Sequence, residues 1–464
     1  MICLGVLMIV LDSTIVSVAL PSIRQDLKFT ETSLAWVVNA YLLTFGGTLL
    51  LGGRLGDIYG HRRLFLTGIT VFTIASLTCG LANTQGQLVF ARGVQGFGGA
   101  IVLAVALSLI MTMFTETAER AKAMSFYGFV CAGGGSISLL LGGALTGAIN
   151  WHWIFLINLP IGVAVCVRGF LLLPDIRPPR VNGRLDVWGA VTGTTSLMLA
   201  VYATVNGNET GWTSARAFGL IGGSVVLFAA FLTIESRVPA PLMPLGIFRL
   251  WNFTLSNAIG VFWSVGSFAW YFISALYMQL VLGCDPVQVG LAFLPANVLE
   301  AVLSAGLSAR LVTRFGVKRP LAAGLLLGAI GLALLGRAPV DGNITMHVLP
   351  SMILLGLGSG IVFNPLLLVA ICDVAPGESG LASGILNTAF MMGGALGLGI
   401  LASFAAARTN ALLASGATTQ VALTAGYHVA FLLAAVLTGA AALLGTVFLR
   451  TKTPVPAPAR CVSV

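Results

Sequence analysis

Charged residues are scarce in this chain of 464 residues. Lysine, arginine, aspartate and glutamate together make up 8% of it, and histidine occurs only four times. Hydrophobic residues make up 57% and the mean hydropathy is +0.99, values that lie well outside the range of soluble domains. The composition therefore excludes a soluble globular fold and indicates a chain that lies almost entirely within a membrane.

Residue types that form metal and nucleophilic sites are few and dispersed. The seven cysteines contain no C-x-x-C pair, and the four histidines are equally scattered, so no metal-ligand spacing and no Cys/His nucleophile arrangement results. We expect no metal, no cofactor and no catalytic triad. The formal net charge of +9 also lacks a continuous basic stripe, so we expect no nucleic-acid partner.

Long apolar segments fill the chain instead. Fourteen of them approach the roughly 20 residues that a membrane-spanning helix needs. They leave mostly short connections and no room for a separate soluble domain. The expected spans are 2–22, 34–53, 64–82, 87–113, 123–147, 153–173, 187–205, 217–235, 253–281, 287–309, 320–337, 346–371, 380–405 and 425–449.

The distribution of basic residues predicts the orientation. With both termini in the cytoplasm, 18 of the 24 basic residues lie on the cytoplasmic side, five lie on the other side, and Arg92 lies within a helix. Such an excess of basic residues is typical of cytoplasmic loops. The first apolar run has no charged n-region and no small-residue cleavage site, so we expect a retained helix rather than a signal peptide.

An internal repeat predicts the architecture. The segment 53–63 reads GRLGDIYGHRR after the second span, and the segment 309–319 reads ARLVTRFGVKR after the tenth, an offset of 256 residues. Two copies in the same orientation indicate parallel repeats with a shared site near the membrane midplane. We expect a six-helix half in 1–173, a linker with two inserted helices in 174–252, and a second six-helix half with a cytoplasmic tail in 253–464.

These segments resemble the major facilitator superfamily, and within it the branch of fourteen-helix drug:proton antiporters. The resemblance covers essentially the whole chain. It rests on LDSTIVSVALP at 11–21, the 53–63 loop, RGVQG at 92–96, WHWIFLINLP at 151–160, YMQLVLG at 277–283 and GLASG at 380–384. It implies export of amphipathic, often cationic compounds in exchange for protons.

The fifth span departs from that family pattern. The antiporter signature usually reads Gly-Pro-x-x-Gly-Gly, whereas 138–143 reads SLLLGG and lacks the glycine-proline pair. Glycines in this span still allow close approach to a neighbouring helix, so we expect tight packing to persist without the proline kink. The glycines assigned to this motif are Gly128, Gly133, Gly134, Gly135, Gly142 and Gly143.

Asp12 is the first candidate for proton coupling. It lies in the middle of the first span, where an unpaired charge costs several kcal/mol or more, so it must face protein or a water-filled path. Arg92 is the natural counter-charge in the fourth span. A polar residue locked between helices is the alternative interpretation for Asp12, and bracing of the fourth helix is the alternative for Arg92.

Glu300 is the second deeply placed acid, at a position that is unusual for the family. It either lines the cavity from the second half, favouring cationic substrates or offering another proton site, or pairs with Asn297 one turn away. Aromatic residues such as Trp263, Trp270 and Tyr271 are interpreted as packing or interface anchors.

The loops after the second and tenth spans are candidates for a cytoplasmic gate. An acid just past a helix end can pair with arginine or with a helix amino end and so close the inner side. The alternative is that the basic residues only orient the chain. The gate residues are Gly53, Asp57, Gly60 and Arg62 in the first repeat, and Gly316 and Lys318 in the second.

The leading hypothesis is therefore a proton-driven exporter in the cell membrane that works by alternating access. We expect a small-molecule substrate, protons and the lipid bilayer as its partners, and a monomeric transporter. Two alternatives are a proton-coupled symporter for nutrient uptake and a polytopic membrane enzyme. No loop holds paired acids or a nucleophile with its base, which argues against the enzyme.

Overall fold

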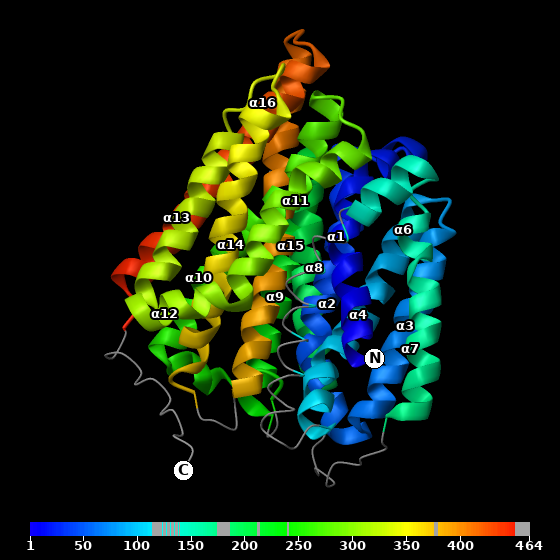
Figure 1. Ribbon diagram of the computed structural model, residues 1–464, viewed down its shortest axis with the longest axis vertical. Coiled ribbons are helices and arrows are strands. Elements are labelled where there is room, and N and C mark those ends of the chain that lie inside the picture. The colour runs from blue at the N-terminus through cyan, green and yellow to red at the C-terminus, as the bar shows by residue number, and fades with distance from the viewer. Residues whose placement is uncertain are drawn as a thin grey trace, which may run out of the picture.

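The structure is a computed structural model that describes residues 1–113, 123, 127, 130, 134, 138, 140–173, 186–210, 214–238, 241–374 and 379–450. Throughout these residues the regular structure is helical, and long helices stand side by side along one direction (Figure 1). Ten helices are long and apolar enough to cross a membrane, and Ser33–Leu49 and Pro286–Val302 are shorter apolar helical segments. The predicted all-helical membrane fold is confirmed.

The first half begins with four long helices and ends with a broken one. Its elements are α1 (Ile2–Leu27), α2 (Glu31–Tyr59), α3 (His61–Gly80), α4 (Gln85–Met113), α6 (Trp153–Leu156) and α7 (Asn158–Leu172). Between α4 and α6, the described residues 140–148 are also helical. Two further helices follow, α8 (Val187–Thr210) and α9 (Ala215–Arg237).

The remaining elements contain three π-helical turns that join or precede long helices. They are η1 (Leu245–Arg249), α10 (Trp251–Leu276), η2 (Tyr277–Val281), α11 (Pro286–Val302), η3 (Leu303–Leu307), α12 (Ser308–Phe315), α13 (Lys318–Leu335), η4 (Ile344–Val348), α14 (Leu349–Ile371), α15 (Ser379–Ala414) and α16 (Thr419–Val447). The turns η2, η3 and η4 are the π-helical ones.

Each expected span overlaps a helix wherever the chain is described, but many helices are longer than expected. The second span, 34–53, lies within α2, which continues to Tyr59, and the span 380–405 lies within α15, which continues to Ala414. An apolar run ends where polar side chains begin. The backbone hydrogen bonds of the helix can continue beyond that point. The expected ends were therefore too short at these places.

Two glycine turns between helices occupy equivalent positions in the internal repeat. Gly60, between α2 and α3, has φ +95°, and Gly316, between α12 and α13, has φ +75°. Both values lie in a region that L side chains rarely adopt, so glycine is required for the sharp turn at each place. The two positions are 256 residues apart, which is the offset of the repeat in the sequence.

Helices pack in two groups with the inserted pair between them. In the first group α2 and α3 pack on α4, and in the second α13 packs on α14 and α16 while α10 packs on α15. The helix α2 also contacts α15 across the groups, and α8 contacts both of these helices (Figure 1). The helix α8 therefore lies beside the α2–α15 contact that joins the two groups. The helix α9 packs on α8.

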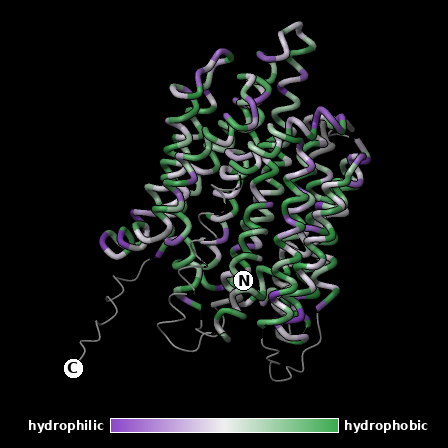
Figure 2. Tube along the Cα trace, turned by 45° about the vertical axis from the view of Figure 1, so that its right-hand side comes forward, coloured by the Kyte–Doolittle hydropathy of each residue, from purple (hydrophilic) through white to green (hydrophobic). Residues whose placement is uncertain are grey.

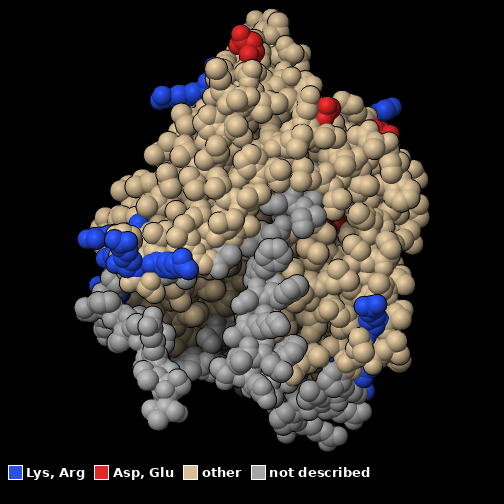
Figure 3. All heavy atoms as spheres, viewed as in Figure 1, with Lys and Arg blue, Asp and Glu red and all other residues tan. Residues whose placement is uncertain are grey.

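The surface separates an apolar belt from polar ends. Hydrophobic residues follow the long helices, and hydrophilic residues gather toward their ends (Figure 2). We call the end where α1 begins and α16 ends the termini side, and the opposite end the far side. On the face shown in Figure 3, acidic atoms lie toward the far side and the largest group of basic atoms lies over the region of α12.

The two groups are joined at the far side. Gln279 Nε2 in η2 donates a 2.8 Å hydrogen bond to the backbone oxygen of Val18 in α1. Gly143 lies so close to α11 that a Cβ atom there would be 2.5 Å from the backbone oxygen of Pro286. These contacts fix the first group against the second near the far-side end of the helices.

Candidate functional site

Asp12 and Arg92 form a buried ion pair between α1 and α4. Arg92 Nη1 lies 2.6 Å from Asp12 Oδ2. The relative exposure is 0% for Asp12 and 1% for Arg92, so both charges are removed from solvent. Such a pair is tolerated only when its geometry is good and its remaining polar atoms are also bonded.

Two amide side chains complete the bonding of this acid. Asp12 Oδ1 accepts hydrogen bonds from Gln95 Nε2 at 2.7 Å and from Asn158 Nδ2 at 3.0 Å. The same two amides also reach Ser76 Oγ, at 2.8 Å from Gln95 and 3.4 Å from Asn158. The network therefore ties together α1, α3, α4 and α7 and satisfies both carboxylate oxygens as an anion.

Arg92 is held from its other side by α2. Its Nε donates a 3.0 Å hydrogen bond to the Val37 backbone oxygen, and its guanidinium carbon lies 4.3 Å from the centre of the Tyr41 ring. The helices α2 and α4 lie close together at Gly96, because glycine has no Cβ atom there. A Cβ atom at this position would collide with the Tyr41 backbone oxygen and with Thr44 Oγ1. This glycine brings α2 within reach of the arginine.

The charge balance of the buried pair depends on whether Asp12 carries a proton. When Asp12 is ionised, its negative charge balances the positive charge of Arg92. Arg92 Nη1 also donates a 2.6 Å hydrogen bond to Gln95 Oε1. Protonation of Asp12 would remove the counter-charge and leave a cation in a low-dielectric environment, which strongly favours rearrangement. The arrangement can therefore convert a change of protonation into a movement between α1 and α4.

The structure brings Asp12 and Arg92 together as the sequence analysis expected, and it adds partners that were not singled out. Gln95 and Asn158 lie inside two of the segments that carried the family resemblance, 92–96 and 151–160. The spacing of Gln95 three residues after Arg92 places both on one helix face and was a usable signal. Ser76 and Tyr41 had no comparable signal in the sequence.

Glu300 belongs to a separate cluster in the second group of helices. Tyr271 Oη in α10 lies 2.8 Å from Asn297 Oδ1 and 3.3 Å from Glu300 Oε2, both in α11. The expected alternative of a pair between Glu300 and Asn297 is thus replaced by a shared contact with a tyrosine. Glu300 is half-buried, whereas Asn297 is buried.

The Tyr271 hydroxyl lies between two oxygen atoms, one of Asn297 and one of Glu300. One hydroxyl carries one hydrogen, so Tyr271 cannot donate fully to two acceptors. If Glu300 carries a proton, it can donate to Tyr271 Oη while Tyr271 donates to Asn297 Oδ1, and both contacts become hydrogen bonds. The cluster can therefore hold a carboxylic acid at Glu300 with both contacts as hydrogen bonds.

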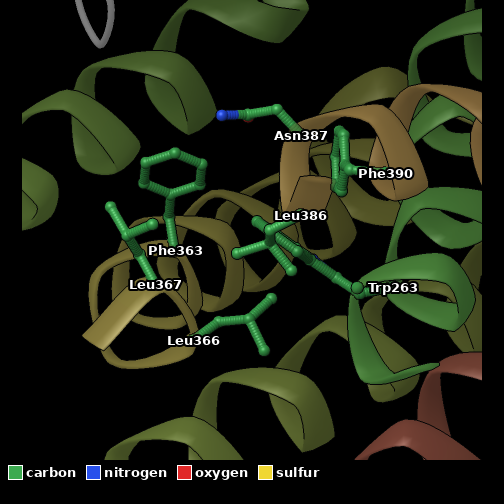
Figure 4. Close-up of a pocket in the computed structure, with 8 residues that line it drawn as sticks. Trp263, Phe363, Leu366, Leu367, Leu386, Asn387 and Phe390 are labelled. Atoms are coloured by element: carbon green, nitrogen blue, oxygen red, sulfur yellow. The ribbon is translucent and has the colours of Figure 1, made fainter. Parts of the chain in front are cut away.

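Aromatic side chains surround a small cavity in the same group of helices. Trp263 in α10, Phe363 in α14 and Phe390 in α15 line it together with leucines and Asn387 (Figure 4). The Trp263 and Phe390 ring centres are 5.0 Å apart. Trp263 therefore faces a cavity, whereas Trp270 is completely buried and packs its ring against Tyr271.

The gate candidates lie at the two equivalent helix junctions. Gly60 and Gly316 form the turns described above. Arg62 Nη2 donates a 2.6 Å hydrogen bond to the Phe170 backbone oxygen in α7, so this arginine braces α3 against α7 within the first group. A Cβ atom at Gly53 would meet no atom within 4 Å. The Asp57 side chain lies outside the described residues, and no contact is recorded for Lys318 in the described part.

The helix before α6 packs tightly through three of the predicted glycines. A Cβ atom at Gly134 would lie 2.7 Å from Val10 Cγ1, and one at Gly142 would lie 2.8 Å from Ile15 Cγ1, both in α1. Gly143 makes the close approach to α11. Close packing therefore persists without the glycine-proline pair. Gly128, Gly133 and Gly135 lie outside the described residues.

The sequence profile of the Major Facilitator Superfamily matches residues 2–398. The chain belongs to the major facilitator superfamily. Among relatives in this superfamily, the puromycin resistance protein pur8 of Streptomyces alboniger is 39% identical over 422 residues, which are 90% of this chain and 84% of that protein. The cephamycin export protein CmcT of Amycolatopsis lactamdurans is 35% identical and covers 88% of this chain and 84% of its own.

Solved transporter structures share the fold at low sequence identity. An auto-inhibited peptide transporter of the POT family aligns with a TM-score of 0.68 and 16% identity, covering 98% of both chains. The xylose transporter XylE of E. coli in an inward open conformation aligns with a TM-score of 0.63 and 16% identity, covering 97% of this chain and 95% of that one. Membership of the superfamily, shown by the profile and the relatives above, makes this chain a multi-pass membrane transporter of a small-molecule substrate.

Proposed function

We propose that this protein is a proton-driven efflux transporter that exports amphipathic, often cationic small molecules, antibiotics among them, by alternating access. It resides in the cell membrane as a monomer with both termini in the cytoplasm. The proton gradient drives it, and no cofactor takes part. Its relatives named for puromycin, cephamycin and tetracenomycin C support export as the direction of transport.

The observation that carries the proposal is the buried network around Asp12. An acid at membrane depth is expensive and is retained for transport or coupling roles. Here it is bonded to an arginine, two amides and, through them, a serine. Because the network links four helices of the first group, a proton that reaches Asp12 changes how these helices hold one another.

Glu300 supplies the second proton-linked group. The shared hydroxyl of Tyr271 suits a protonated acid, and release of that proton creates a negative charge that attracts a cationic substrate. The exchange is then an alternation at one carboxyl between a proton and a cation. The half-buried position of Glu300 is consistent with access for either ligand.

Transport in sealed vesicles tests the proposal. Purified protein is reconstituted in liposomes, a pH jump is applied, and uptake of puromycin, of the cation ethidium and of uncharged chloramphenicol is followed. Antiport moves substrate against the proton flow. Movement with the proton flow would identify a symporter instead, and absence of movement for an extended panel of amphipaths would refute export.

A further inference from the structure

A second acidic site lies at the termini-side end of the inserted helices, away from Asp12 and Glu300. Asp186 immediately precedes α8, and Glu235 lies in the last turn of α9. Their relative exposures are 4% and 3%. Two carboxyl groups that are this well buried need hydrogen-bond partners or a bound cation.

Each carboxyl group has one bonded oxygen and one without a partner. Asp186 Oδ1 accepts a 2.8 Å hydrogen bond from the Gly189 backbone nitrogen, and Glu235 Oε2 accepts a 3.1 Å hydrogen bond from the Met243 backbone nitrogen. The other two oxygens, Asp186 Oδ2 and Glu235 Oε1, are buried and have no hydrogen-bond partner among the residues that the structure describes. Both carboxyl groups are therefore half satisfied.

The two unpaired oxygens are directed at the same place. A Cβ atom at Gly189 would lie 2.9 Å from Glu235 Oε1 and closer still to Asp186 Oδ2, so the two oxygens are separated by less than twice that distance. Glycine at this position leaves the space between them free. Two unpaired carboxyl oxygens this near to each other in a buried place favour a bound proton or cation between the two groups.

We propose that Asp186 and Glu235 together form a binding site for a single proton. Helix position decides which group carries it. Asp186 caps the amino end of α8, where a negative charge is favoured, whereas Glu235 lies at the carboxyl end of α9, where it is disfavoured. Glu235 Oε1 therefore carries the proton and faces Asp186 Oδ2.

Among the described side chains, few other charges lie on the elements packed around this site; Arg177, Arg180 and Arg184, in the linker before Asp186, lie outside the described residues. The helix α8 contacts α2, α9 and α15, and α9 contacts η1. Among described side chains on these elements, Arg237 and Arg249 are the charged groups at this end, and neither is joined to Asp186 or Glu235 by an ion pair, while Arg408 lies near the other end of α15. The side chains of Arg54 and Asp57 in α2 lie outside the described set.

The proton has a structural consequence. Glu235 also holds Met243, which lies in the segment that leads through η1 to α10, so the site joins the start of α8, the end of α9 and the entry to the second group. Release of the proton places two anions together and weakens this junction. The inserted pair is therefore attached most firmly when the site is protonated.

Thermal unfolding of the full-length protein in lipid nanodiscs tests the site. If the folded protein binds one proton more than the unfolded chain, stability falls as pH rises, with a tenfold change in the unfolding equilibrium per pH unit. Glu235→Gln and Asp186→Asn retain an acceptor oxygen for Met243 or Gly189 and supply an N–H in place of the proton. We expect either variant to lose this tenfold change of the unfolding equilibrium per pH unit. Asp341→Asn, a substitution of an exposed acid, should retain it.

Infrared difference spectra give a second readout that does not depend on transport. The wild-type spectrum should contain a carboxylic-acid carbonyl component that disappears at alkaline pH and is missing in Glu235→Gln, whereas the component assigned to Glu300 should remain in that variant and be missing in Glu300→Gln. An unchanged band and an unchanged slope in Glu235→Gln and Asp186→Asn would overturn the proposal. Restoration of alkaline stability by NaCl or KCl, but not by choline chloride at the same ionic strength, would instead assign the site to a metal cation.

Discussion

The two intramembrane acids, Asp12 and Glu300, differ in how their hydrogen bonds are satisfied. Asp12 is completely buried and accepts bonds from Arg92, Gln95 and Asn158, all of which favour the anion. Glu300 is half-buried, and among the described residues its side chain has one hydrogen-bonding contact, a tyrosine hydroxyl that also contacts Asn297. The donors around Asp12 favour its charged form, whereas the hydroxyl beside Glu300 is shared with Asn297.

This difference suggests a division of labour. A carboxylate bonded to an arginine and two amides gives up its charge only when those donors move away, so protonation of Asp12 is tied to a change in helix packing. Glu300 can exchange a proton with a smaller rearrangement of the helices, because no cationic side chain contacts it among the described residues. We infer that Asp12 controls conformation and that Glu300 selects the ligand.

The largest expected effect comes from Asp12→Asn. The amide cannot carry the charge that neutralises Arg92, so proton-coupled transport should be abolished. A proton moving through about 100 mV supplies about 2.3 kcal/mol, which corresponds to roughly 50-fold accumulation, so the loss is easily measured in vesicles. Normal substrate-induced proton release by this variant would refute the role of Asp12.

Stability must be separated from coupling in that experiment. Breaking one partner of a buried ion pair costs about 3–5 kcal/mol because the other charge remains unpaired. The double variant Asp12→Asn/Arg92→Met removes both charges and should recover much of this stability. Recovery of stability without recovery of transport is the expected result, and recovery of both would make the pair purely structural.

Glu300→Gln should produce a smaller and more selective loss. The carboxylate attracts a cation through a low-dielectric environment, whereas an uncharged substrate gains little from it. Export of ethidium should therefore fall more than export of chloramphenicol at equal protein amounts. Equal losses for the two compounds would show that Glu300 is only a structural partner of Tyr271.

Tyr271→Phe tests the shared hydroxyl directly. It leaves Asn297 Oδ1 without the hydrogen bond that it receives at 2.8 Å, and an unsatisfied buried acceptor costs about 1–3 kcal/mol. We expect a moderate drop in thermal stability and weakened cation export. Phe272→Leu, in the next position of α10, is a matched control, and an equal loss of cation selectivity there would contradict a specific role for the hydroxyl.

Composition and the repeat predicted the fold well, whereas the partners of the buried acids were harder to predict. Apolar runs locate helices because the membrane requires each backbone group to be bonded within its own helix. Hydropathy contains no information on which faces of separate helices meet. Asp12 and Arg92 could be paired because lone charges at membrane depth need partners, but Ser76, Tyr41 and Tyr271 are ordinary residues for a helix, and only their positions in space make them part of a site.

The inserted helices illustrate the same limit. Asp186 and Glu235 are 49 positions apart in the sequence, and each lies where a polar residue at a helix end is unremarkable. Their proximity depends on the antiparallel packing of α8 and α9, which Ser196 and Ser224 fix by reciprocal 2.9 Å hydrogen bonds to each other's backbone oxygens. Neither periodicity nor hydropathy specifies that register.

The smallest expected effects concern the two equivalent glycine turns, which allow the gate to be tested without altering a charge. Gly60→Ala and Gly316→Ala each place a side chain at positive φ, a strain of about 1–3 kcal/mol. If the first-repeat loop closes the inner side, Gly60→Ala should slow transport more than Gly316→Ala at similar stability, with substrate binding unchanged because both turns lie away from the midplane. Equal transport rates in the two variants, or a parallel loss of binding in Gly60→Ala, would show that the turns serve only the fold.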